Sequence, residues 1–516
     1  MIIVDRQTKS LVLPADIGAQ MSGLKRDFKV NGLNLTAVPH TDWTTIEAQQ
    51  LTGKPIEAPI ACYYDWPGPY TPRIHQIETA THLVMLQRAF CWDDIGTGKT
   101  AATIWAMLWA RLHHGVKRVL VVSPKSTLRT TWQKELFLLQ PTLNVAVLDK
   151  TRSHKLEQLR DDYDVYIINP DSLWRVDEAI SAMDPDLIIV DEQTYFKTWN
   201  TNRTKALRSL TPDKRVWMLS GEPQPEGPMD LFAPGKIVCP EVMPRSKTRW
   251  QDMTMIKVGQ WKWVPKPGVE DMISQLFAPY AIRHARDDCI DLPDTTYTTI
   301  EVEPTTQQLK ISAELEKEAA ADVDEGVIMA VNEAAHLQKL LQISCGAVRV
   351  DLNEGKHIHN IDTTKLDALD DIIQATHGPL IVFAPFTAVL DSLETWLKKQ
   401  KVSYHRVDGQ TSSSKRNDVF NDIQEDNVKV LLANPRAMSH GITLTTSNTI
   451  VWFGLPWSNE TYSQANGRII RSGQQRKTYI IHLTCMPVEK MVYCRLRDKQ
   501  KLQGTLLQLL KQEVVQ

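Results

Sequence analysis

The chain has 516 residues, enough for about two to four domains that each bury a core. Hydrophobic residues make up 42% and charged residues 23%, which is ordinary for a folded protein, and the formal net charge of −2 means that a polyanionic partner needs a local basic surface. Because no run of about 18 apolar residues and no basic-then-apolar N-terminal segment occurs, we expect no membrane span, no signal peptide and a cytosolic protein.

Composition changes along the chain in five steps. Residues 1–68 are polar and rich in turn formers, which predicts a small accessory region or an extended wrap. In 69–236 and again in 351–484, apolar runs such as "RVLVVSP", "DLIIVDE", "PLIVFAPF" and "VKVLLANP" alternate with helix-like segments, which predicts two successive α/β lobes with parallel sheets. Residues 237–350 indicate a helical and aromatic insert with a linker, and 485–516 a C-terminal helix that packs on the lobes. The seven cysteines are scattered without a C-x-x-C pair, so we expect reduced, mostly buried thiols.

The stretch "CWDDIGTGKT", residues 91–100, has most features of a phosphate-binding loop. Gly96 and Gly98 let backbone N–H groups form an anion cradle at the start of a helix, Lys99 would reach the outer phosphates, and the Thr100 hydroxyl would bind Mg²⁺. The first glycine of the common pattern is replaced by Asp93. Taken alone, the stretch is also compatible with a glycine turn that caps an ordinary helix.

Two later stretches offer partners for this loop. The strand-like "PDLIIVDEQ" ends in Asp191, a candidate Mg²⁺ ligand, and Glu192, a candidate for orienting the attacking water. In "YSQANGRIIRSGQ", Arg468 and Arg471 are three residues apart, so on a helix both guanidiniums would share a face and could stabilise a γ-phosphate. The plainer readings are a solvated helix start and a solvated basic helix face.

Two aromatic or polar features are weaker. In "YTPRIHQIETA", Gln76 could hydrogen-bond adenine, with Arg73 nearby. The tryptophans Trp250, Trp261 and Trp263 lie among basic residues and could stack on bases, but packing of a helical subdomain is favoured.

The motifs taken in order resemble those of superfamily two helicases, and specifically the Swi/Snf-type DNA translocases. The order is "PRIHQ", "DDIGTGKT", "LVVSPKSTLRTTWQKE", "DVYIINPDSL", "IIVDEQTYFK", "MLSGEP", "LIVFAPF", "HRVDGQTSSSKRNDVF", "VLLANPRAMSHGITLTTSNTIVW" and "QANGRIIRSGQ". The resemblance covers about residues 70 to 500. It also explains Asp93, because that branch commonly begins its loop D-E-x-G-x-G-K-T. Since the glycines essential to the cradle are Gly96 and Gly98, Asp93→Gly should leave ATP binding largely intact.

The resemblance implies two RecA-like lobes with ATP between them, and it assigns roles to particular positions. The catalytic set is Lys99, Asp191, Glu192, Arg468 and Arg471. The ATP-binding set is Arg73, Gln76, Gly96, Thr97, Gly98, Lys99, Thr100, Gly441 and Gln464, with Thr100 and Asp191 holding Mg²⁺. The nucleic-acid set is Ser123, Pro124, Lys125, Asn169 and Pro170, which would contact the backbone without sequence preference.

The sequence departs from the family pattern at three positions. Thr194 stands where histidine is common, Glu222 where threonine is common, and Gly467 at a position that is often acidic. The chain is also compact, which favours a bacterial or viral origin and the cytoplasm of a bacterial or infected host cell.

The resemblance predicts an ATP-dependent translocase on double-stranded or branched DNA, with RNA disfavoured, that remodels DNA or protein–DNA complexes without necessarily unwinding. Residues 1–68 are a candidate contact for a protein partner. Two alternatives stay open: a strand-separating DNA or RNA helicase, and a scaffold that binds nucleic acid or a host protein with little ATP turnover.

Overall fold

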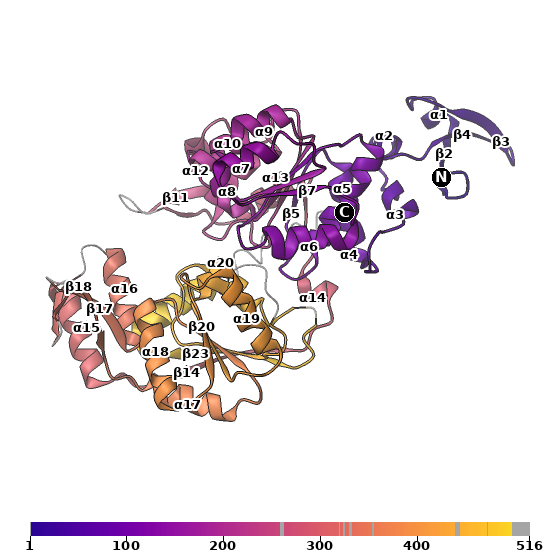
Figure 1. Cartoon of the computed structure of the whole chain (residues 1–516). Coiled ribbons are helices and arrows are strands. Elements are labelled where there is room, and N and C mark those ends of the chain that lie inside the picture. Colours follow the sequence, from indigo (N-terminus) through magenta and orange to yellow (C-terminus); the bar gives the residue numbers. More distant parts are fainter. Residues whose placement is uncertain are drawn as a thin grey trace. The chain divides into compact units, whose positions relative to one another are not determined.

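The computed structural model describes residues 2–258, 263–318, 320–323, 326–329, 333–352, 355–438, 444–471 and 473–497. These form two compact units, one made of residues 2–224 and 228–285, the other of residues 225–227 and 286–497. Each unit contains a parallel sheet flanked by helices (Figure 1), which confirms the predicted α/β class with two tandem lobes.

The first lobe holds a seven-stranded parallel sheet, counted over the described residues, in the order β13-β5-β10-β9-β6-β8-β7. The strands are β5 (Arg88–Cys91), β6 (Val119–Val122), β7 (Val145–Leu148), β8 (Val165–Ile168), β9 (Leu187–Asp191), β10 (Arg215–Leu219) and β13 (Ala281–Ile282). Both faces are covered: Phe90 and Trp92 belong to one core cluster, and Ala89 and Cys91 to the other. Burial on both sides explains why these strands read as continuous Val/Ile runs.

Helices cover the two faces of this sheet. Around it lie α4 (Ile74–Met85), α5 (Lys99–His113), α6 (Lys134–Leu139), α7 (Arg152–Gln158), α8 (Pro170–Leu173), α9 (Asp177–Met183), α10 (Asn202–Leu210), α11 (Phe232–Val238), α12 (Lys247–Thr254) and α13 (Val269–Phe277). Trp105 of α5 packs in one core cluster, whereas Leu207 of α10 and Phe277 of α13 pack in the other.

The N-terminal region is a small antiparallel sheet with its own core. Its strands, in the order β1-β2-β4-β3, and its helices are β1 (Ile3–Asp5), β2 (Ser10–Pro14), β3 (Arg26–Val30), β4 (Leu33–Pro39), α1 (Ala15–Gly18), α2 (Asp42–Thr52) and α3 (Pro59–Tyr63). In Figure 1, α2 and α3 lie between these strands and the helices of the first lobe. Asp42 of α2 accepts hydrogen bonds from Trp109 Nε1 at 2.7 Å and His114 Nε2 at 2.8 Å, which fastens the region to α5.

The range 237–350, predicted as a helical insert, contributes strands to both lobes. Strand β13 completes the edge of the first sheet, and β14 (Thr295–Glu301) pairs in parallel with β23 (Thr478–Thr484) in the second. Strand β13 has only two residues, and β14 is Thr-rich and half-exposed. Neither contains the apolar run from which a strand is predicted, so composition could not reveal them. Trp250 is fully buried and donates to Pro228 O, which confirms the packing interpretation at this position, whereas Trp261 lies outside the described residues.

The second lobe holds a six-stranded parallel sheet, counted over the described residues, in the order β14-β23-β22-β19-β21-β20. Its other strands and its flanking helices are β19 (Leu380–Phe383), β20 (Tyr404–Val407), β21 (Val430–Ala433), β22 (Thr449–Trp452), α17 (Lys365–Ala375), α18 (Thr387–Lys399), α19 (Ser413–Gln424) and α20 (Asn459–Asn466). Helical residues 487–497 follow β23.

Ahead of this sheet, a segment predicted to be helical alternates helix and strand. It contains α14 (Arg286–Cys289), α15 (Thr306–Glu318), β15 (Ala320–Val323), β16 (Gly326–Met329), α16 (Glu333–Ser344), β17 (Ala347–Leu352) and β18 (Gly355–Asn360), and the last four strands form an antiparallel sheet. A further hairpin, β11 (Met255–Lys257) with β12 (Trp263–Pro265), extends from α12. All seven cysteines, each within the described ranges, are free thiols, as predicted.

Candidate nucleotide-binding site

The predicted phosphate and metal residues gather at one edge of the first sheet, where its parallel strands end. Loops leave this edge after β5, β10, β9, β6 and β8, and they carry residues 92–100, 220–223, 192–193, 123–125 and 169, respectively. The carboxyl edge of a parallel sheet is where α/β proteins bind ligands. Sequence order alone could not show that these loops are neighbours, because the strands are not sequential in the sheet.

The phosphate loop has the backbone that the glycine pattern predicted. Gly96 and Gly98 have φ values of 92° and 88°, a region that residues with a Cβ rarely adopt. A Cβ on Gly98 would also lie 2.2 Å from Gln76 Nε2. Gly98 caps α5, so the helix begins at Lys99, whose Nζ donates to Asp93 O at 2.8 Å and to Asp94 O. The lysine ammonium is therefore held at the loop by backbone carbonyls.

Gln76 reaches the phosphate loop from the first turn of α4. Its Oε1 accepts from Arg73 N at 2.9 Å, and its Nε2 donates to Thr97 O at 3.2 Å. His75 Nε2 also contacts Thr97 O at 2.8 Å. The side chain predicted to read adenine thus braces the loop in this conformation, and His75 is a brace that sequence reasoning missed.

The acidic pair is oriented by neighbouring loops. Asp191 Oδ2 accepts hydrogen bonds from Ser123 Oγ at 3.0 Å and Trp132 Nε1 at 2.8 Å. Glu192 has a φ of 61°, a left-handed conformation that costs free energy for a non-glycine residue, and such strain is common at functional sites. Its Oε1 accepts from Ser220 Oγ at 3.0 Å.

Four further site residues have hydrogen bonds that the sequence did not indicate. Trp132 and Ser220 hold the two carboxylates, and only the "SGEP" motif hinted at the serine. Thr194, which stands where histidine is common, has its hydroxyl 3.4 Å from Glu192 Oε1. Glu222 is buried at 6% exposure, and its N–H donates to Ser220 Oγ.

The predicted nucleic-acid residues divide into buried and accessible ones. Ser123 and Pro124 are buried, and because the Ser123 hydroxyl bonds Asp191, the prediction that these two contact a nucleic-acid backbone does not fit their placement. Lys125 is exposed, Asn169 is half-buried and Pro170 is buried, and all three line a cavity of about 400 Å³.

That cavity is rich in cations. Its other lining residues are Asp149, Lys150, Lys155, Asp171, Ser172, Arg175 and Tyr195. Both acids are already paired, Asp149 with Arg129 at 2.7 Å and Asp171 with Arg203 at 2.9 Å. The surplus of positive charge suits a phosphate group.

In the second lobe, the arginine motif lies in turns and not on a helix. Helix α20 ends at Asn466 with Gly467 as its cap, and the next residues continue as turns in which Ile469 and Ile470 are buried. The expected shared helix face of Arg468 and Arg471 is therefore corrected: Arg468 is buried at 4% exposure, and burial lowers the pKa of the half-buried Arg471.

Gln464 of α20 is also buried, and its Nε2 donates to Glu460 Oε1 at 3.3 Å. Gly441, predicted at the interface of the lobes, lies outside the described residues.

Comparison with family models decides the class. The SNF2-related domain matches residues 75–349, more than half of the chain, and the helicase conserved C-terminal domain matches residues 364–473. The chain belongs to the SNF2-related family. It is a nucleic-acid-dependent ATPase with two RecA-like lobes, and the predicted resemblance is confirmed.

Relatives of this SNF2-related ATPase come from viruses, bacteria and animals. Putative protein p41 of Acyrthosiphon pisum secondary endosymbiont phage 1 is 27% identical, with 86% of this chain and 99% of that protein covered. The SWI/SNF-related matrix-associated actin-dependent regulator of chromatin subfamily A-like protein 1 of Xenopus laevis is 27% identical over 80% of this chain but only 41% of that protein. An uncharacterized ATP-dependent helicase of Mycoplasma genitalium is 24% identical, with 79% and 39% covered. The chain thus spans about two fifths of the length of the last two.

Among solved structures, the Sulfolobus solfataricus SWI2/SNF2 ATPase core in complex with dsDNA is similar, with a TM-score of 0.42 and 22% identity over 87% of this chain and 97% of that one.

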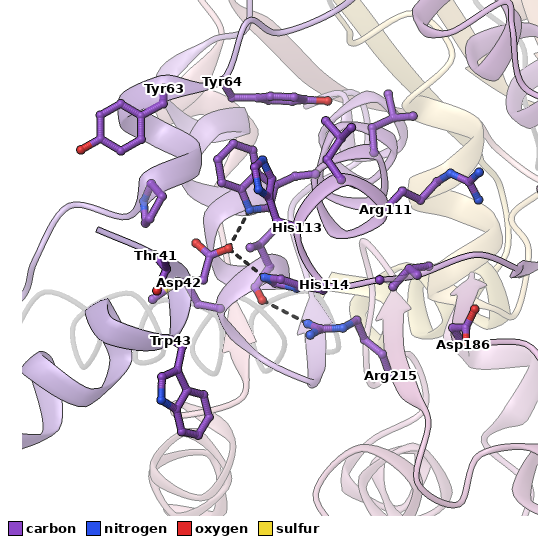
Figure 2. Close-up of a pocket in the computed structure, with 18 of the residues that line it drawn as sticks. Thr41, Asp42, Trp43, Tyr63, Tyr64, Arg111, His113, His114, Asp186 and Arg215 are labelled. Atoms are coloured by element: carbon purple, nitrogen blue, oxygen red, sulfur yellow. Dashed lines mark hydrogen bonds and ion pairs between the residues drawn. The ribbon is translucent and has the colours of Figure 1, made fainter. Parts of the chain in front are cut away.

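A cavity of about 1430 Å³ in the first unit of the SNF2-related ATPase lies away from the phosphate loop. Asp186 and Arg215, which line it, stand at the beginnings of β9 and β10, so it opens at the opposite edge of the sheet. Figure 2 shows Asp42 and His114 joined by a hydrogen bond on its wall, with Trp43 pointing away from them. In the part of the chain that the structure describes, no helix combines the length and apolar character needed to cross a bilayer.

Proposed function

We propose that the chain uses ATP hydrolysis to translocate along double-stranded DNA and so remodels DNA or protein–DNA complexes by branch migration, annealing or protein displacement. Unwinding is not required by this proposal. The SNF2-related family and its ATPase motifs support the motor class. A surface of this chain, described next, supports a nucleic-acid backbone as the binding partner, and the choice of duplex DNA rests on the family resemblance.

The cationic cavity of the first lobe is the observation that carries the proposal. It lies at the carboxyl edge of the sheet, where Asn169 follows β8 and Lys125 follows β6. Strand β6 lies directly beside β9, which ends in Asp191, so the cations and the carboxylate proposed to bind Mg²⁺ lie on neighbouring loops. Backbone contacts made by such cations give affinity without sequence preference, which a moving enzyme requires.

The chemistry proposed at the neighbouring loops follows from the donor set. The Thr100 hydroxyl and the Asp191 carboxylate are oxygen ligands of the kind that Mg²⁺ prefers, and the metal would neutralise charge on the phosphates. Glu192, held by Ser220, would orient the attacking water, while Lys99 would exchange its backbone carbonyls for phosphate oxygens.

The second lobe would complete the reaction. Arg468 and Arg471 would stabilise the γ-phosphate charge when the lobes close. Reopening after hydrolysis would shift the contacts of the lobes along the DNA backbone. Arginine residues supplied in this way commonly contribute a factor of about 10³ to 10⁵ in rate. Gln76 and Arg73 remain the proposed adenine contacts.

The test compares ATPase stimulation by duplex, single-stranded, forked and four-way DNA and by RNA. We expect duplex and branched DNA to stimulate most, and displacement of a triplex-forming strand without separation of a fork. Stimulation by RNA alone, or efficient fork unwinding, would favour the helicase alternative. Equal turnover by wild type and Glu192→Gln would favour the scaffold.

A second experiment addresses the cationic cavity. Simultaneous replacement of the exposed residues Lys125, Lys150 and Arg175 by alanine should weaken duplex binding and lower the slope of log Kd against log salt by up to about 3, since each phosphate contact contributes ~0.9. Lys54→Ala, an exposed lysine of the N-terminal region, is the matched control. An unchanged slope in the triple variant would show that the cavity does not contact the DNA backbone.

A further inference from the structure

The aspartate that replaces the first glycine of the phosphate loop is buried and fully engaged. Its side chain is 2% exposed. Oδ2 accepts from Thr79 Oγ1 at 2.6 Å, and Oδ1 accepts from both the backbone N and the ring Nδ1 of His284, at 2.8 and 2.9 Å. Asp93 therefore links the loop to α4 and to a residue 191 positions later in the chain.

His284 lies between two carboxylates. Its Nδ1 faces Asp93, and its Nε2 lies 2.8 Å from Glu78 Oε2 on α4. Because both ring nitrogens face acceptors, the hydrogen bonds assign a doubly protonated, cationic ring. The other charged or titratable groups around this pair are Lys99 of α5, the Cys91 thiol of β5, His75 and His82 of α4, and the neighbouring Arg283 and Asp94.

Arg283, the residue before His284, holds Asp94, the next residue of the phosphate loop. Arg283 Nη1 donates to Asp94 Oδ1 at 2.7 Å and to Trp92 O at 3.0 Å. Backbone bonds continue the β13 pairing beyond the strand, from Trp92 N to Ile282 O and from Asp94 N to His284 O. Residues 282–284 thus form the outer wall of the loop.

Residues 282–284 also affect the position of Lys99, the lysine proposed to contact the phosphates. The carbonyls that accept from Lys99 Nζ belong to Asp93 and Asp94, the two residues whose side chains are held by His284 and Arg283. A shift of either aspartate moves the lysine's partners and the cradle that follows.

The segment is also where the chain leaves the first unit. The unit boundary falls between Ala285 and Arg286, directly after His284. On the far side, Arg286 Nη1 donates to Ile470 O at 3.2 Å, one residue before Arg471. The covalent connection between the units therefore starts at a residue bound to the phosphate loop and continues with one bound to the arginine motif.

We infer that His284 is a positioning residue for ATP hydrolysis, which holds Asp93 and through it the phosphate loop in its binding conformation. The inference rests on the ATPase activity but not on the choice of nucleic acid. It also changes the expectation for Asp93→Gly: because the carboxylate has three partners, its removal should weaken ATP binding and not leave it intact.

The charge states give this contact a pH signature. Burial alone would lower the pKa of His284, but the hydrogen bond and charge of Asp93, and then those of Glu78, raise it above its ordinary value. Burial alone would raise the pKa of Asp93, but His284 and Thr79 lower it. A raised histidine pKa means that the ion pair is intact below about pH 6.5 and is lost as pH rises through the folded-state value.

The experiment measures binding of a fluorescent ATP analogue without nucleic acid, and steady-state ATPase between pH 6 and 9, for the full chain. His284→Ala should raise the Kd about tenfold or more, because a charge-assisted hydrogen bond is commonly worth ~10- to 100-fold. In wild type, ATP binding and turnover should decline as pH rises and His284 loses its charge. The Kd of His284→Gln, which can still donate to Asp93, should stay within about threefold of the wild-type value, but this decline at high pH should be absent. His82→Gln, a histidine that bonds Tyr280 O and not Asp93, is the matched control and should resemble wild type.

Three results would overturn the inference: a wild-type Kd in His284→Ala, an alkaline decline that persists in His284→Gln, or equal losses in His284→Ala and His82→Gln. If His284→Ala does not fold, coupling between Asp93→Asn and His284→Gln decides, and additive effects on the Kd would count against the contact. A wild type that binds ATP without stimulation by DNA would refute the proposed translocase and leave this test valid.

Discussion

Replacing Lys365 by methionine is expected to destabilise the second unit strongly, because it would leave a buried carboxylate without its cation. Lys365 begins α17, and its Nζ donates to Glu489 Oε1 and, at 3.1 Å, to Phe453 O. The two side chains are 0% and 1% exposed. Glu489 Oε2 also accepts from the backbone N of Cys485 at 2.8 Å, so the pair fastens helical residues 487–497 to the lobe.

The magnitude follows from burial. Breaking a buried ion pair by removing one partner costs about 3–5 kcal/mol, which corresponds to a fall in Tm of about 6–20 °C for a unit of this size. The double variant Lys365→Met, Glu489→Leu removes both charges and should recover most of the loss. The adjacent Lys490 provides the control: its pair with Glu301 is 52% and 60% exposed, so Lys490→Met should cost at most about 1 kcal/mol.

The assay is thermal and urea unfolding of the full chain, followed by intrinsic fluorescence, with the two units resolved as separate transitions where they unfold separately.

The pair also has a predicted pH dependence. Burial alone would lower the pKa of Lys365, but the charge of Glu489 raises it above its ordinary value. A raised lysine pKa means that the pair is intact throughout neutral pH and is lost only as pH rises through that higher value. A loss below about 1 kcal/mol in Lys365→Met, or a double variant no more stable than the single one, would refute the reasoning.

Two further predictions concern catalysis. Ser220→Ala removes the donor to Glu192, so kcat should fall about tenfold with ATP affinity nearly unchanged, whereas Ser209→Ala, whose hydroxyl donates to the Ala206 carbonyl of its own helix, should behave as wild type. A Ser220→Ala variant with full kcat would show that Glu192 does not depend on this bond. Arg286→Ala removes the donor to Ile470 O next to the arginine motif, so kcat should fall severalfold while binding of an ATP analogue stays intact; a parallel loss of affinity would contradict a role at this motif.

The sheets and the backbone of the glycine loop were predictable because local sequence decides them. Val/Ile runs such as β6 and β9 are buried on both faces, and this double burial is what makes a parallel strand visible in sequence. Gly96 and Gly98 require positive φ, so their spacing encodes the loop without reference to the rest of the chain.

What escaped prediction depends on contacts between distant segments. Strand β13 has two residues and is recognisable only by its pairing with β5. Trp132 and Ser220 gain their roles from carboxylates on other loops, and the motifs that contain them do not show which carboxylate each one contacts. The turn that carries Arg468 follows from the burial of Ile469 and Ile470 against the lobe, which overrides the helical spacing of the arginines.

Asp93 shows how a local pattern and a distant contact combine. The family pattern explains why an acid is accepted in the loop, but a buried carboxylate is costly unless it is paired and hydrogen-bonded. The cation that meets this need is His284, at the point where the chain leaves the first unit. A glycine there would need no such partner, so the acid creates a dependence of the loop on the connection between the units. That dependence offers a physical route by which a change in the connection could reach the backbone of the loop, since the loop and residues 282–284 share the Asp93 carboxylate.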